Sequence, residues 1–144
     1  MQNFRPKNKV LDTEVIRLCR KMEDAGYALY DLWKKSYRYT LVSDFRSDLR
    51  EIRVNIIKAY TTDKRLPAGK LYYYGKAKAA LANMECDMEH MVGGNINIMS
   101  YSQWAEFAEN MDKVSGMVEK LVNTLEKNSN LQNIQFFPYV FFDQ

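Results

Sequence analysis

An all-α fold, an up-down-up-down four-helix bundle, is predicted by three features of this sequence. Four stretches place apolar residues every three or four positions, the spacing that gives a helix one apolar face. Short segments containing polar residues, glycine or proline separate them, so consecutive helices are expected to run in opposite directions. The 144 residues suffice for one domain with its own core. We expect residues 1–127 to form the bundle domain and residues 128–144 an aromatic tail.

The first helix is predicted to begin at Asp12 or Thr13, after a flexible lead-in over residues 1–11. Either side chain can accept a hydrogen bond from the unpaired N–H groups of a first turn. Gly26 lies in mid-helix, where it costs about 1 kcal/mol relative to alanine, so it indicates a close approach by another backbone or a tolerated weak point. The apolar stripe consists of Val15, Leu18, Cys19, Met22, Ala25, Leu29, Leu32 and Trp33.

The second helix follows a connection over residues 34–40, with Thr40 or Ser43 as its cap. After this helix, residues 61–69 are expected to form a turn region, in which Pro67 suits a first helical position. The stripe of the second helix consists of Val42, Phe45, Leu49, Ile52, Ile56, Ala59 and Tyr60.

The third helix, from Leu71 to Val92, is the one around which we expect the bundle to form. It spans roughly 33 Å at about 1.5 Å per residue, so its partners must have similar lengths. Gly93 and Gly94 can supply the left-handed backbone that ends a helix. Its stripe consists of Leu71, Tyr74, Ala77, Lys78, Leu81, Met84, Glu85, Met88, Met91 and Val92.

The fourth helix is predicted to start after Ser100, because Gln103 completes a capping box three positions later. Gly116 indicates a tight helix crossing or a weak point. The stripe consists of Trp104, Phe107, Ala108, Met111, Val114, Val118, Leu121, Val122 and Leu125.

Charge is distributed unevenly along the chain. Residues 1–78 contain 18 Lys or Arg against 9 Asp or Glu, whereas residues 79–144 contain 3 against 9. Such a dipolar molecule can present a basic face to nucleic acid or to an acidic protein, or bind copies of itself.

Arg46, Arg50 and Arg53 share one flank of the second helix. Either they form solvated surface pairs with Asp48 and Glu51, or their guanidinium groups form a ladder that binds phosphates. Tyrosines are frequent in the same basic half, and they can stack on unpaired bases or pack at helix ends and subunit interfaces. They are Tyr27, Tyr30, Tyr37, Tyr39, Tyr60, Tyr72, Tyr73 and Tyr74.

Residue types needed for catalysis are scarce. His90 is the only histidine, so a metal pair or a proton relay built on two histidines is excluded. Cys19 and Cys86 fall in helical patterns, where we expect buried, reduced thiols rather than a disulfide or metal site. We therefore expect no enzyme activity, no cofactor and no metal. The sequence also predicts no signal peptide and no membrane span, and a cytoplasmic location.

The aromatic tail contains an apolar cluster around Pro138. Exposed to water, such a run would favour aggregation, so we expect it to dock. It either folds back on its own bundle or a neighbouring subunit, or binds a partner. The candidate partner-binding residues are Phe136, Phe137, Tyr139, Phe141 and Phe142.

Three short motifs together resemble a known family. They are the run from Tyr37 to Ile52, the Lys70-Leu71-Tyr72 start of the third helix, and Ser100-Tyr-Ser-Gln-Trp followed by Val114-Ser-Gly-Met-Val. Their order resembles the four-helix proteins related to the 23S ribosomal RNA intervening-sequence protein, over roughly Thr13 to Lys127. Within that group the chain looks most like the accessory variability determinant proteins of diversity-generating retroelements.

This resemblance implies a homopentamer that binds template RNA and a reverse transcriptase and supports mutagenic copying. The alternative within the same four-helix family is a protein-only assembly scaffold. Under the first interpretation, basic side chains bind RNA phosphates without reading sequence. The candidates are Arg17, Arg20, Lys21, Lys34, Lys35, Arg38, Arg46, Arg50, Arg53, Lys64 and Arg65.

Overall fold

The computed structural model describes residues 9–29, 41–92 and 99–128. Every element in these ranges is helical, which confirms the all-α prediction and agrees with a four-helix bundle. The elements are the 3₁₀ turn η1 (Lys9–Asp12) and the helices α1 (Glu14–Leu29), α3 (Leu41–Thr61), α4 (Pro67–Met91) and α5 (Tyr101–Asn128).

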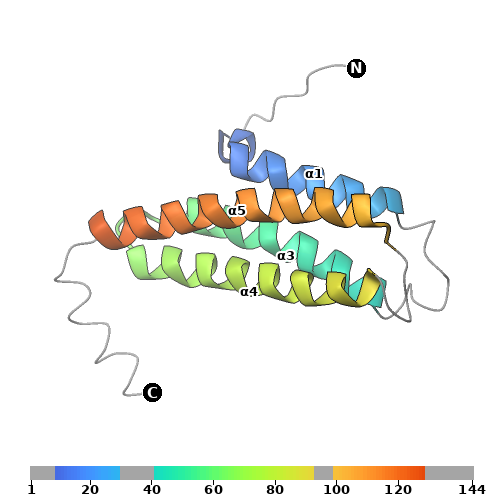
Figure 1. The fold of residues 1–144 in the computed structure, drawn as a ribbon. Helices are drawn as coiled ribbons and strands as arrows, with labels where there is room; N and C mark the ends of the chain where they lie inside the picture. The colour runs from blue at the N-terminus through green and yellow to red at the C-terminus, as the bar shows by residue number, and fades with distance from the viewer. Residues whose placement is uncertain (1–8, 30–40, 93–98, 129–144) are drawn as a thin grey trace.

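The four helices lie side by side, each running opposite to the one before it (Figure 1). Helix α3 packs against α1 and, most extensively, against α4, while α5 closes the bundle by packing against α1 and α4. None of the described helices has the length and apolar character that crossing a membrane requires.

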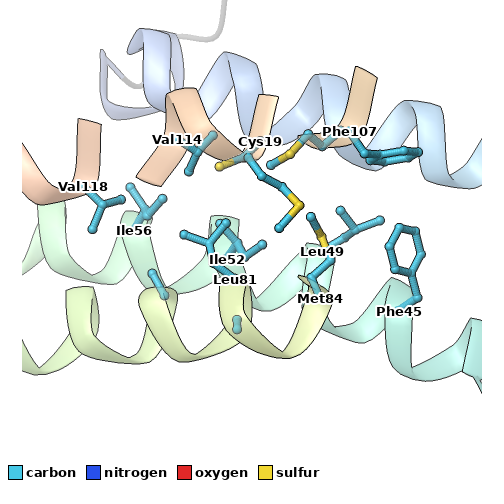
Figure 2. Packing of buried hydrophobic residues seen from close by; sticks show 14 of the residues in the cluster. Cys19, Phe45, Leu49, Ile52, Ile56, Leu81, Met84, Phe107, Val114 and Val118 are labelled. Carbon is cyan, nitrogen blue, oxygen red and sulfur yellow. The ribbon is translucent and has the colours of Figure 1, made fainter. Parts of the chain in front are cut away.

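The core lies along the common axis and receives side chains from all four helices. Figure 2 shows Cys19 of α1 and residues of α3 and α4 meeting Val114 and Val118 of α5. Phe45 is fully buried, and its ring meets that of Phe107 edge to face, with centroids 5.5 Å apart. The predicted stripe of α3 is confirmed: six of its seven residues are buried, and Tyr60 packs partly buried against them.

Helix ends agree with the sequence prediction at two places. The Ser100 N–H donates to Oε1 of Gln103 at 2.9 Å, and the Gln103 N–H donates to Oγ of Ser100 at 3.2 Å, which completes the predicted capping box. Pro67 occupies the first turn of α4 as predicted, although this helix therefore begins four residues before Leu71.

Several predictions about the first helix are wrong. Residues 9–12 form a 3₁₀ turn, and Leu11 packs against the core, so they are not a flexible lead-in. The Thr13 hydroxyl donates to the carbonyl oxygen of Val10 at 2.8 Å and does not cap α1. Ile16, outside the predicted stripe, is fully buried. The predicted continuation through Leu32 and Trp33 lies outside the described residues.

Corrections also apply to the other helices. Ser43 lies inside α3, so it is not a cap, and Thr40 is outside the described residues. Lys78 and Glu85 are exposed and do not belong to the buried face of α4. Asn55 and Asn110 are buried polar residues that the periodic pattern did not indicate.

Gly26 and Gly116 differ in what surrounds them. A Cβ atom on Gly26 would lie 2.6 Å from Cδ1 of the buried Leu49, so the close approach is made by a side chain and not by backbone. A Cβ atom on Gly116 would meet nothing within 4 Å, so of the two predicted alternatives the weak point is correct.

This contrast predicts substitutions with opposite effects. Gly116→Ala should raise the free energy of unfolding by about 0.5–1 kcal/mol, because alanine loses less backbone entropy in a helix. Gly26→Ala gains the same entropic stabilisation but overpacks the core, so we expect its free energy of unfolding to fall by about 1 kcal/mol. Urea unfolding followed by circular dichroism measures both, and a Gly26→Ala protein as stable as Gly116→Ala would contradict the packing described here.

Candidate nucleic-acid interface

The densest basic region of the described chain surrounds the turn between α3 and α4. From Ile52 to Met84 the sequence contains seven Lys or Arg and a single acid, Asp63. Asp63 organises the turn: its carbonyl oxygen accepts the Leu66 N–H at 2.8 Å, and its Oδ1 accepts the backbone N–H of Arg65 at 2.9 Å. Because Pro67 starts α4 immediately afterwards, the two helices form a tight hairpin.

Two of the basic residues have structural partners at this turn. Nζ of Lys70 donates to the carbonyl oxygens of Ala59 at 2.8 Å and Tyr60 at 3.3 Å, which satisfies the C-terminal end of α3. The exposed Arg65 guanidinium forms an ion pair with the Asp63 carboxylate at 2.7 Å, and this contact lowers the pKa of Asp63. Surface pairs of this kind exchange easily with another anion.

Aromatic rings lie among the cations of the hairpin. Tyr72 and Tyr73 meet edge to face at 5.3 Å, with Lys58 Nζ 5.7 Å from the Tyr73 ring centroid and Lys76 Nζ 5.2 Å from that of Tyr72. The Tyr72 residue is 58% exposed, which leaves ring surface open to a ligand. We define the hairpin patch as Lys58, Lys64, Arg65, Tyr72, Tyr73 and Lys76.

The arginines of α3 do not form an open ladder. Arg53 Nε donates to Oε1 of Glu23 at 2.7 Å, and Glu23 is only 7% exposed. The guanidinium carbon of Arg46 lies 4.9 Å from the Tyr27 ring centroid. Arg50 is exposed, whereas Arg46 and Arg53 are partly buried, so Arg50 is the one arginine of the three at the surface.

Asp48 does not form the expected surface pair with these arginines. It turns towards Asp87 of α4, and burial, together with the hydrogen bond and charge of Asp87, raises the pKa of Asp48 to about 7. Asp44 and Glu51 on α3 add further negative charge. Glu51 itself accepts a hydrogen bond from the Asn55 amide at 3.1 Å. The described ion pairs therefore do not include the expected solvated surface pairs of Asp48 and Glu51 with these arginines.

The carboxyl pair predicts a pH-dependent stability. Since the pKa of Asp48 is higher in the folded than in the unfolded chain, its stabilising contribution is complete below about pH 4 and is lost as the pH rises through about 7. Asp48→Asn should flatten this dependence and stabilise the fold at pH 8 by about 1 kcal/mol, after allowance for solvent screening of a partly exposed group. Urea unfolding at pH 5 and pH 8 tests this, with Asp24→Asn on α1 as a control. If Asp48→Asn were less stable than the unmodified protein at pH 8, charge repulsion between Asp48 and Asp87 could not be the cause of the pH dependence.

The remaining predicted phosphate-binding residues have different surroundings. Arg17 forms an ion pair with Asp12 at 2.7 Å, whereas Arg20 and Lys21 are exposed on α1. Lys64 is exposed in the hairpin turn. Several candidates lie outside the described residues: Lys34, Lys35, Arg38 and, in the tail, Phe136, Phe137, Tyr139, Phe141 and Phe142.

The thiols differ from each other. Cys19 is buried as predicted, and burial, with a further contribution from Glu23, raises the pKa of its thiol to about 12. Cys86 is exposed, so the prediction that both cysteines are buried is wrong. Within residues 9–29, 41–92 and 99–128, no group of three or more His, Cys, Asp or Glu has an arrangement that would hold a metal ion.

The hairpin patch was only partly predicted, because Lys58 and Lys76 were not among the candidates. The signal that identifies them is the near absence of acids between Ile52 and Met84. Comparisons with protein-family models and with curated proteins find no match to this chain.

Proposed function

We propose that the chain is a non-catalytic RNA-binding protein and that the hairpin patch holds the RNA. The observation that carries this proposal is the combination of exposed lysines with the open ring of Tyr72 at one end of the α3–α4 hairpin. Lysine and arginine bind phosphate oxygens, and an exposed aromatic ring stacks on an unpaired base.

The preferred ligand is single-stranded RNA or a loop, because stacking on Tyr72 requires a base that is not paired within a duplex. The patch offers phosphate contacts and stacking but no arrangement specific to one base, so binding tolerates many sequences. Arg20, Lys21 and Arg50 supply further exposed cations on α1 and α3.

The order of short motifs along the chain supports a finer proposal. The RNA is then the template of a diversity-generating retroelement, its reverse transcriptase is the second partner, and the protein is a cytoplasmic homopentamer. Light scattering tests the assembly, since a pentamer has five times the mass of one chain. Co-purification with the polymerase before and after RNase treatment separates a direct protein contact from one bridged by RNA.

RNA binding is tested by fluorescence anisotropy with a labelled, unstructured oligonucleotide. We expect the patch variant Lys58→Gln, Lys64→Gln and Lys76→Gln to bind at least about tenfold more weakly than the unmodified protein. The matched control is Lys113→Gln, Lys120→Gln and Lys127→Gln, which removes the same charge from exposed positions of α5. Equal losses in the two variants would overturn the assignment of the patch.

A second pair of variants tests stacking. Tyr72→Ala should weaken binding by about 5–100-fold, the range that loss of one base–aromatic contact gives. Tyr72→Phe keeps the ring and should bind RNA nearly as well as the unmodified protein. Equal binding by the Ala and Phe variants would remove stacking from the proposal.

A further inference from the structure

A groove runs along the line where α4 meets α5. It consists of two adjoining hollows of about 100 Å³ and 190 Å³ that share Glu85, Met111 and Asp112 as lining residues. On α4 the lining extends from Lys78 to Glu89, about 17 Å of helix at 1.5 Å per residue. We call this hollow the α4–α5 groove.

The floor of the groove is apolar. Met88 and Met111 contribute side chains that are otherwise part of the core, and Trp104 extends the apolar surface to the solvent. Trp104 is held by an edge contact to the Tyr101 ring at 6.1 Å. Methionine side chains adapt to differently shaped apolar ligands, so a floor of this kind accommodates varied anchors.

The rim of the groove is acidic. Glu85, Glu89 and Asp112 are exposed, and the structure gives them no ion-pair partner among the described residues. Lys78 is the one basic residue in the lining, and its Nζ is bound by both carboxylate oxygens of Glu119 at 3.0 Å. Three uncompensated carboxylates around an apolar floor complement a ligand that is both cationic and apolar.

We propose that the α4–α5 groove binds a basic amphipathic helix of a partner protein. A helix of about three turns matches the groove, with apolar residues on one face seated over the methionines and Trp104 and flanking Lys or Arg paired with the rim carboxylates. The site differs from the hairpin patch: Tyr72 and Glu85 are about 20 Å apart along α4, which permits RNA and the helix to bind together.

Charge and burial favour a separate partner over the chain itself. Residues 128–144 contain no Lys, Arg or His, so the tail lacks the cations that the rim requires. In a second copy, the described helices direct their apolar faces into their own core. The tail and the described helices of a second copy thus offer no basic helix with a free apolar face, which favours a partner protein as the occupant.

The probe is a fluorescein-labelled peptide of about 14 residues. Its Leu residues recur every three or four positions, so that they form one face of a helix, and Lys residues flank that face. We expect the full-length protein to bind it and not a peptide with Glu in place of Lys. Glu85→Gln, Glu89→Gln and Asp112→Asn together should weaken binding at least about tenfold. The matched control, Glu14→Gln, Asp24→Asn and Asp44→Asn, removes three exposed acids from α1 and α3 and should change the affinity less than about threefold. In a Trp33→Phe background, the emission of Trp104 should shift on binding.

Four results would overturn the proposal. The first is no binding of the peptide by the full-length protein. The second is an equal loss of affinity in the groove and control variants, which would show that the rim carboxylates do not select the ligand. Tighter peptide binding by Phe136→Ala with Phe137→Ala would assign the groove to the tail. Loss of self-association in the groove variant, seen by light scattering, would assign it to a second copy. RNA binding should be unchanged in the groove variant, so the two proposals fail independently.

Discussion

Phe45→Ala should lower the free energy of unfolding by about 4 kcal/mol, the largest effect that we expect from a single substitution. Phe45 of α3 is fully buried, and its ring packs against that of Phe107 on α5. Truncation removes the transfer free energy of the ring and leaves a cavity that close-packed neighbours fill only in part. Because small domains are stable by only about 5–15 kcal/mol, the variant should be close to unfolding at 37 °C.

The measurement is urea unfolding followed by circular dichroism. Tyr101→Ala is the matched control, because Tyr101 also makes an edge contact, to Trp104, but is 78% exposed. Its removal should change stability by less than about 0.5 kcal/mol. If Phe45→Ala lost less than about 1 kcal/mol, Phe45 could not lie in a close-packed core.

Breaking the ion pair between Glu23 and Arg53 should have the second largest effect, a loss of about 2–3 kcal/mol for Arg53→Met. This substitution leaves the Glu23 carboxylate largely buried without its 2.7 Å partner. Glu23→Leu combined with Arg53→Met removes both charges and should recover much of the stability, because an apolar pair carries no desolvation penalty.

The comparison pair is Lys78 and Glu119, which are 3.0 Å apart but have both side chains 48% exposed. A double-mutant cycle on the exposed pair should give a coupling of about 0.2–1 kcal/mol, against more than about 1 kcal/mol for Glu23 and Arg53. Equal couplings would show that burial does not strengthen the α1–α3 pair.

Helix positions were predictable from the sequence because apolar periodicity depends only on local spacing. The stripe of α3, the capping box at Ser100 and the position of Pro67 all follow from neighbouring residues. Contacts between helices were not predictable, because they depend on how far each helix is rotated about its axis. Thus Asp48 meets Asp87, Arg53 meets Glu23, and Ile16 is buried outside the expected stripe.

At the candidate site, too, composition was predictable from the sequence but contacts between side chains were not. The excess of basic residues near the α3–α4 turn is visible in the sequence, but the approach of Lys58 and Lys76 to two tyrosine rings requires the folded hairpin. Trp104 fits the apolar stripe of α5 by its spacing, yet it lies partly exposed at the α4–α5 groove. Spacing identifies the face of a helix but not whether a neighbouring helix covers it.

The salt dependence of RNA affinity tests the central claim, RNA binding through the hairpin patch, most directly. Each phosphate contact with a single strand contributes about −0.7 to the slope of log K against log salt concentration. The variant with Lys58→Gln, Lys64→Gln and Lys76→Gln should therefore reduce the magnitude of that slope by about 2 between roughly 50 and 200 mM salt. The α5 control variant should leave the slope unchanged. A slope that is near zero in the unmodified protein, or the same in the patch variant, would contradict the claim.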